Sequence, residues 1–179
     1  MVSAGPLLLE GNQGQMRFLK RCDYNYVLEV FDQENAEKDA RRSDMIDGWP
    51  RDRFREANDR FKGEWYEYEF NRGDLALIRL HYNIEFGIPR QGMMVRDALN
   101  LPAFKQWVAD GKDQLLPRNS HLWLASKWFN NNGPEYKDMI DHTGCFIVLD
   151  GLHRTLAWVN SGVQSVLVFI AGNPDTAAK

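Results

Sequence analysis

The residues best suited to chemistry lie in one short run, Asp150-Gly151-Leu152-His153-Arg154. The apolar segment 145–149 before it has the composition of a strand buried on both faces. The segment 152–161 carries leucine and valine residues at helical spacing, so the run is expected at a helix N-terminus. The first N–H groups of a helix have no intrahelical acceptor, and the helix dipole adds partial positive charge. This position therefore suits a phosphate group or another anion.

Each residue type in the run fits a role at such a site. Gly151 allows a ligand to approach the backbone, and the backbone from Gly151 through Leu152 to His153 would hold phosphate oxygens. Arg154 adds a planar guanidinium that binds phosphate through two parallel hydrogen bonds. The imidazole of His153 can donate a hydrogen bond or transfer a proton. Asp150 is a candidate for handling the proton of an acceptor molecule.

The same residues also fit simpler structural roles. Asp150 is equally suited to cap the following helix through its carboxylate. Arg154 would serve as a partner in a surface ion pair, and His153 as a structural hydrogen-bonding residue. We expect Arg154 to share a helical face with Trp158, whose indole would pack against the guanidinium. For Arg154 the sequence context favours phosphate contact over the ion pair.

Length and composition limit the class of protein. The 179 residues suffice for one domain or one domain with an appendage, and the 44% apolar content suffices for a core. A net charge of -3 and a pI of about 5.8 argue against a protein whose main task is holding duplex DNA. Cys22 and Cys145 match no zinc or redox spacing and are interpreted as thiols in a reducing compartment. No apolar run approaches the ~18 residues of a membrane span, so we expect a cytoplasmic protein.

The first seventy residues predict a mainly helical region. Segment 24–31 has the composition of either a strand or a buried helix. Segments 36–45 and 51–61 predict helices, the second with an apolar face that includes Phe54. Arginines in this region, Arg53 among them, alternate with acidic residues that would largely cancel a basic patch. The region is therefore interpreted as a solvated helical layer.

The remainder of the chain predicts alternating strands and helices. Turn signals and β-forming residues predict strands over 65–70 and 75–86, joined as a hairpin. In chain order, the later predicted elements are a helix between Pro102 and Gly111, a helix over 120–129, a strand over 145–149, a helix over 152–161 ended by Gly162, and a strand over 163–170.

The run from Val148 to Ala157 resembles the signature of the ParB/sulfiredoxin superfamily, which includes partition proteins, sulfiredoxins, free-serine kinases and ParB-like nucleases. Its pattern is a strand, an Asp-Gly-x-His-Arg or related turn, a helix with an alanine, a glycine and a last strand. The resemblance covers about residues 140–171 and extends back to about Leu75. It implies an α+β fold in which a ParB/sulfiredoxin-like mixed sheet with packed helices occupies 71–179. Residues 1–70 are then a mainly helical N-terminal extension.

Residue 152 distinguishes the subfamilies. Sulfiredoxins carry their catalytic cysteine immediately before the His-Arg pair, where this chain has Leu152, so sulfinic-acid reduction is disfavoured. Partition proteins carry Gly-Glu-Arg-Arg, which disfavours nucleotide-gated clamping on DNA. Free-serine kinases carry Asp-Gly-His-His-Arg, and this chain differs from that run only at Leu152. The chain therefore resembles the small-molecule kinase branch most closely.

This resemblance implies a kinase that transfers a phosphoryl group from ATP or ADP, with Mg²⁺, to a small hydroxylated molecule. The implied nucleotide-binding residues are Gly151, Leu152, His153 and Arg154, and the implied catalytic residues are Asp150, His153 and Glu85. Glu85 is the candidate for the glutamate that acts as the base in the serine kinases. The simpler interpretation is that Glu85 is an ordinary charged residue on an edge strand. The histidines share no metal-binding spacing, so no resident metal site is expected.

Two loops are candidates to close over the ligand, 90–96 and 118–120. Two other functions stay open at this point. One is a ParB-like protein associated with nucleic acid, either a nuclease or a nucleotide-gated DNA binder, which the acidic pI disfavours. The other is a nucleotide-binding module without catalysis. For each of these functions we expect a nucleotide as ligand and no association with a membrane.

Overall fold

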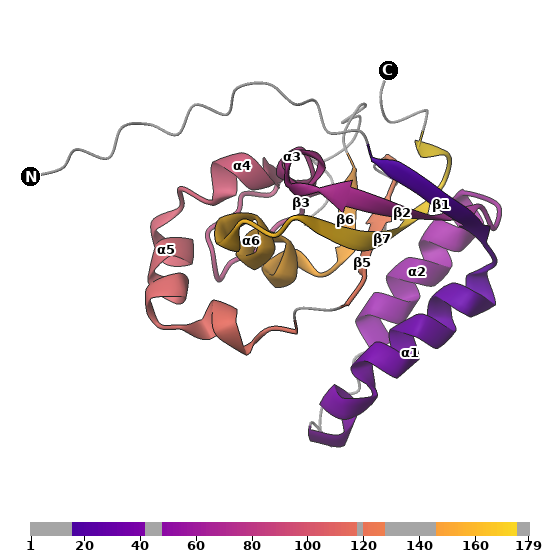
Figure 1. Cartoon of the computed structure of the whole chain (residues 1–179), viewed down its shortest axis with the longest axis horizontal. Coiled ribbons are helices and arrows are strands. Elements are labelled where there is room, and N and C mark those ends of the chain that lie inside the picture. The colour runs from indigo at the N-terminus through magenta and orange to yellow at the C-terminus, as the bar shows by residue number, and fades with distance from the viewer. Residues whose placement is uncertain (1–15, 42–47, 118–119, 128–145, 175–179) are drawn as a thin grey trace, which may run out of the picture.

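The computed structural model describes residues 16–41, 48–117, 120–127 and 146–174 (Figure 1). These residues form a mixed α+β fold built on one seven-stranded sheet, which confirms the predicted class at this level. In chain order the elements are β1 (Arg17–Cys22), α1 (Tyr24–Arg41), α2 (Gly48–Arg60), β2 (Trp65–Asn71), α3 (Arg72–Ala76), β3 (Arg79–Leu80), β4 (Met93–Met94), α4 (Val95–Ala98), α5 (Pro102–Ala109), the 3₁₀ turn η1 (Lys112–Leu115), β5 (Leu122–Ala125), β6 (Ile147–Asp150), α6 (Leu152–Ser161) and β7 (Ser165–Ala171).

The strands lie in the order β1-β2-β7-β5-β6-β3-β4. Neighbouring pairs are antiparallel except β5 with β7 and β3 with β6, which are parallel. The seven residues of β2 pair with the seven of β7, from Trp65 opposite Ala171 to Asn71 opposite Ser165. Residues before and after position 70 therefore contribute to one continuous sheet.

Helices cover both faces of this sheet, and each face has its own core. Because successive side chains of β2 point to opposite faces of the sheet, Trp65 lies on the face covered by α1 and α2, and Phe70 on the face covered by α6. On the first face, Phe31 and Phe54 of the two helices pack edge to face, with ring centroids 5.0 Å apart. Figure 1 shows α1 and α2 side by side on one flank, with α4, α5 and α6 on the other. No helix in the described ranges is long and apolar enough to cross a membrane.

Segment 24–31, for which composition allowed either a strand or a helix, forms the first part of α1. Asp23 precedes it and accepts the N–H of Tyr26 at 2.8 Å through its carboxylate, which is an N-cap contact. Val27 and Phe31 are buried one helical turn apart. The cap and this spacing together favour the helix. Of the predicted helix over 36–45, residues 36–41 form the end of α1, and residues 42–45 lie outside the described part of the chain. The predicted helix over 51–61 corresponds to α2, and Phe54 lies on the buried face as expected.

The predicted hairpin between 65–70 and 75–86 is wrong. The first segment does form β2, but Asn71 ends the strand and starts α3 through a capping box. The Asn71 side chain accepts the N–H of Asp74 at 3.0 Å, and Asp74 accepts the N–H of Asn71 at 2.9 Å. Only Arg79 and Leu80 of the second segment become a strand, and β3 lies at the far side of the sheet from β2.

The predicted helix over 120–129 is also wrong, because Leu122–Ala125 forms β5 in the interior of the sheet between β7 and β6. All four of its residues are buried, so its apolar run serves two packed faces. The predictions for α5, α6 and β7 agree with the structure in type and closely in bounds. Gly162 ends α6 with a left-handed φ of 75°. The predicted strand over 145–149 corresponds to β6.

The thiol of Cys22 is buried at the end of β1, and burial with the nearby Glu67 charge raises its pKa to about 11. At pH 8 only about one thousandth of such a thiol is ionised. We therefore expect native Cys145→Ser protein to resist alkylation by iodoacetamide, with mass spectrometry as the readout. The same protein in denaturant should gain one adduct, and rapid labelling of the native form would contradict the burial of Cys22.

Candidate functional site

Gly151 occupies the junction between β6 and α6 with a left-handed φ of 103°. A Cβ at this position would lie 2.6 Å from Leu122 Cδ2 and 3.1 Å from the Arg154 guanidinium, so both the backbone and the packing require glycine. The space expected to admit a ligand beside the Gly151 Cα is thus filled by the protein's own side chains. A ligand would approach the N–H groups of the first turn of α6 instead.

Asp150 does not cap α6. The N-cap position belongs to Gly151, and α6 has no side-chain cap hydrogen bond. Asp150 instead accepts a hydrogen bond from Arg154 Nη2 at 2.6 Å, across one helical turn. The first intrahelical contacts come from Thr155, whose N–H and hydroxyl both donate to the Gly151 carbonyl at 2.8 Å. The N–H groups before Thr155 are left at the open end of the helix, as an anion site requires.

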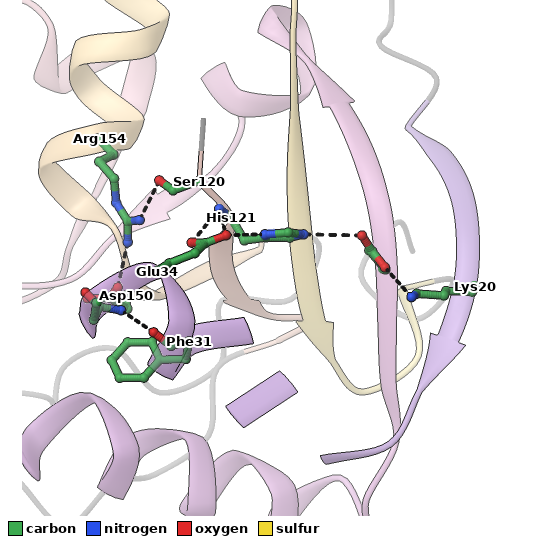
Figure 2. A network of polar contacts seen from close by, with 9 residues as sticks. Lys20, Phe31, Glu34, Ser120, His121, Asp150 and Arg154 are labelled. Atoms are coloured by element: carbon green, nitrogen blue, oxygen red, sulfur yellow. Dashed lines mark hydrogen bonds and ion pairs between the residues drawn. The ribbon is translucent and has the colours of Figure 1, made fainter. Parts of the chain in front are cut away.

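Arg154 is buried, with 5% of its surface exposed, and its guanidinium is held inside the protein. Besides the bond to Asp150, its Nη1 donates to Ser120 Oγ at 2.8 Å (Figure 2). The indole beside it is that of Trp123, 5.5 Å from the guanidinium carbon to the ring centroid, where the sequence suggested Trp158. Burial and these two contacts leave little of the guanidinium open to a phosphate.

His153 and Glu85 meet at the surface beside the first turn of α6. Their side chains are 39% and 49% exposed, and His153 Nε2 lies 2.7 Å from Glu85 Oε2. Glu85 lies in a turn closed by the backbone pairing of Asn83 with Ile88, not on the predicted strand. Phe86 of this turn is buried and packs against the imidazole, with centroids 5.0 Å apart. The buried ring places Glu85 beside the helix.

The contact with Glu85 bears on which ring nitrogen of His153 is available to accept a proton. When Nε2 carries the proton and donates to the Glu85 carboxylate, the lone pair of the neutral ring is on Nδ1. A carboxylate in this position orients the ring and stabilises it once it is protonated. The pair can therefore act as a general base toward a hydroxyl group. Of the predicted site residues, the structure brings His153 together with Glu85, and Arg154 together with Asp150.

Arg53 is a residue that the sequence interpretation missed. It was assigned to a solvated helical layer, yet it is 3% exposed. Its guanidinium donates to the carbonyl of Leu149 at 2.8 Å and to that of Val148 at 3.0 Å. Arg53 and Arg154 thus bring two guanidinium groups to the last three residues of β6. The available signal was helical spacing, because Arg53 lies one turn before the buried Ala57.

His81 is buried close to this region. Its Nδ1 lies 2.9 Å from the Tyr82 carbonyl, so the neutral ring donates through Nδ1. Burial first, and then the Arg53 charge, lower the pKa of His81 to about 3, with a smaller contribution from His153. His81 is therefore neutral near pH 7 and adds no positive charge beside His153.

A second polar cluster lies on the sheet face covered by α1, as Figure 2 shows. His121 Nδ1 lies 2.6 Å from Glu34 Oε1, and Nε2 lies 3.2 Å from Glu67 Oε1. Glu34 also accepts the backbone N–H of His121, and Lys20 lies 3.3 Å from Glu67. The ring stacks on Phe169 with centroids 4.5 Å apart. The sequence marked His121 as an ordinary residue, since its partners come from α1 and β2.

Of the two loops expected to close over a ligand, 118–120 contributes Ser120 to Arg154, and residues 118–119 lie outside the described part. In the other loop, Arg96 is paired loosely with its neighbour Asp97, at 3.9 Å. Neither observation places a loop over the first turn of α6.

Comparison of this chain with known protein families, with curated proteins and with solved structures finds no match in any of the three.

The Arg154–Asp150 pair gives a prediction about stability. Arg154→Ala removes a buried side chain and leaves the partly buried Asp150 carboxylate without its partner, so we expect a loss of about 2–4 kcal/mol in the free energy of unfolding, measured with urea. Asp150→Asn keeps an acceptor for the guanidinium and should lose less. The exposed pair Arg55–Asp52 is the matched control, where Arg55→Ala should change stability by less than about 1 kcal/mol. Equal losses at the two pairs would contradict the internal role of Arg154.

The neutral state of His81 gives a prediction about pH. Below its ordinary value of 6.5, the unfolded chain binds a proton at this position while the folded protein does not. Stability therefore falls as the pH drops toward 3. Between pH 7 and pH 5 the wild type should lose about 2 kcal/mol more than His81→Gln, measured by urea unfolding at each pH. Parallel stability curves for the two proteins would show that His81 titrates normally in the fold.

Proposed function

We propose that this chain is a phosphotransferase that moves a phosphoryl group from ATP or ADP to a small hydroxylated molecule. The observation that carries the proposal is the His153–Glu85 pair, joined at 2.7 Å beside the uncapped first turn of α6. A base next to an anion-binding helix end is the arrangement that phosphoryl transfer to a hydroxyl group needs.

The phosphate would bind to the N–H groups of Leu152 and His153, where the helix dipole favours negative charge. Arg53 and Arg154 lie at the adjoining end of β6 and add positive potential without direct contact. Arg154 thereby has a different role from the direct phosphate contact that the sequence suggested. Because the guanidinium is held by Asp150 and Ser120, Arg154 shapes the turn and its field, and the backbone makes the contacts to phosphate oxygens.

In the transfer step, Nδ1 of His153 takes the proton of the acceptor hydroxyl as its oxygen forms a bond to the terminal phosphorus. The bond from that phosphorus to the bridging oxygen breaks, so ATP leaves as ADP, or ADP as AMP. Glu85 stabilises the imidazolium, which then returns its proton to solvent. Atoms and charges balance without a further reactant.

The residues present are compatible with Mg²⁺ carried by the nucleotide. Mg²⁺ commonly keeps several waters and takes one or two protein carboxylates with phosphate oxygens. No set of three potential ligand residues gathers within the described part of the chain, so most of its ligands would be water and phosphate. Asp150, with one carboxylate oxygen bonded to Arg154, is the candidate protein ligand. When bound, the ion would neutralise charge on the transferred phosphoryl group.

The arrangement of the C-terminal elements also supports the ParB/sulfiredoxin-like interpretation as part of this proposal. Strand β6, the Asp-Gly turn, helix α6, Gly162 and strand β7 follow in the order that the motif requires. Ala157 of the motif is buried in the core beneath α6. We propose, on the basis of this motif and its context, that the chain belongs to this superfamily.

Thermal shift and coupled detection of ADP or AMP test the proposal. We expect Mg-ATP or Mg-ADP to stabilise the wild-type protein, and turnover with one of serine, ethanolamine, glycerol or inositol. His153→Asn and Glu85→Gln should lower turnover by about 10²–10⁴-fold while keeping the nucleotide-induced shift. Glu56→Gln, an exposed change on α2, is the matched control and should leave both readouts unchanged.

Three results would contradict the proposal. Stabilisation by duplex DNA without any nucleotide effect would favour the nucleic-acid function. A nucleotide shift without turnover on the panel, unchanged in both variants, would favour a binding module. Full turnover in His153→Asn would remove the imidazole from the mechanism.

A further inference from the structure

A cavity of about 350 Å³ lies on the sheet face that carries the His121 cluster. Its wall includes Glu34 of α1, Glu69 of β2, the segment Ser120–His121, and Ser165 and Leu167 of β7. The volume falls in the range of small-molecule sites, which begins near 300 Å³. The His153–Glu85 pair is not among the wall residues, so the cavity is a separate feature of the protein.

Most hydrogen-bond donors in the cavity wall already face acceptors of the protein. His121 directs its backbone N–H and its Nδ1 to Glu34, and its Nε2 to Glu67. Ser165 donates its hydroxyl hydrogen to Glu69 at 2.9 Å. Each carboxylate has about four lone-pair positions, so Glu34 and Glu69 retain acceptor capacity. A ligand that fits this wall must bring several hydrogen-bond donors.

Ser120 supplies the complementary group. Its oxygen accepts the hydrogen bond from Arg154, and a hydroxyl that accepts still has one hydrogen to donate. Figure 2 shows Ser120 between the Arg154 guanidinium and the Glu34–His121 contact. The wall therefore offers one donor beside an excess of acceptors, a combination that hydroxyl groups satisfy because each both donates and accepts.

The charges around the cavity decide between a cationic and a neutral ligand. The two ring nitrogens of His121 both face carboxylate oxygens, Nδ1 that of Glu34 and Nε2 that of Glu67. Glu69 is paired with Arg17 at 2.5 Å, and Glu67 with Lys20 at 3.3 Å. Each carboxylate of the cluster, Glu34, Glu67 and Glu69, thus already has a partner within the protein. An ammonium group would have to compete with these partners, whereas a neutral ligand only adds hydrogen bonds to them.

One part of the wall is apolar. Leu167 is 38% exposed, although Phe169, two residues along the same strand face, is fully buried. The carbon-bound hydrogens of a polyol or sugar ring would cover such a surface, while its hydroxyl groups reach the carboxylates.

We infer that this cavity binds a small, neutral, polyhydroxylated molecule. Glu34 and Glu69 accept hydrogen bonds from its hydroxyl groups, Ser120 donates one, and Leu167 contacts its carbon skeleton. The inference does not depend on phosphoryl transfer, because it rests on a different face of the sheet from the His153–Glu85 pair.

Amide NMR of the full-length chain tests the site with glycerol, myo-inositol and glucose as probes and with ethanolamine as the cationic comparison. We expect at least one neutral probe to bind with a dissociation constant on the order of 1 mM, as small ligands do. The perturbed amides should cluster at His121, Ser165 and Leu167. Ethanolamine should perturb them less at the same concentration.

Leu167→Trp fills the cavity mouth and should weaken the binding by about tenfold or more. Leu77→Trp, the same change at another exposed leucine, is the matched control and should bind as the wild type does. The inference is overturned if no neutral probe perturbs the cavity amides, if ethanolamine binds more tightly than every neutral probe, or if Leu167→Trp binds normally.

Discussion

The ion pair between the buried Arg154 and the partly buried Asp150 is the contact on which the β6–α6 junction depends. A guanidinium in the protein interior is stabilised by hydrogen-bond acceptors, and here Ser120 and Asp150 accept from its two terminal nitrogens. The side chain folds back over Gly151, where only glycine leaves enough room. This arrangement joins the end of a central strand, the start of α6 and the segment leading into β5.

The polar side chains of this junction lie on two different sides of the sheet. Arg154 leaves the first turn of α6 toward Trp123, on the face covered by α1 and α2. His153, the preceding residue, packs against Phe86, which belongs to the core of the opposite face. Successive residues of a helix point about 100° apart, so one short motif can serve two separate environments. The side chains of His153 and Arg154 therefore face different environments, and only His153 lies beside the open first turn of α6.

Local signals sufficed to predict α6 and Gly162, because spacing and the helix end are both encoded within ten residues. They failed for β5, since a short apolar run fits a buried strand as well as a buried helix, and only its neighbours β7 and β6 decide. The hairpin failed because Asn71 caps a helix where a turn was predicted. The sequence indicated His153, Arg154 and Glu85 as site residues, but not which of them pair. The His153–Glu85 contact joins residues 68 apart in the chain, and the Arg154–Ser120 contact joins residues 34 apart.

Burial explains why Arg53 and His121 were missed as well. A charged residue is normally exposed, so a sequence rich in alternating charges predicts a solvated surface. Arg53 departs from this rule because two strand-end carbonyls accept its hydrogen bonds, and His121 because carboxylates face both of its ring nitrogens. Each is stabilised by partners that folding brings from another element. Polar groups held in this way keep their geometry without a ligand. The segment Ser120–His121 and the end of β6, which the Ser120–Arg154 contact connects, are therefore organised before any ligand binds.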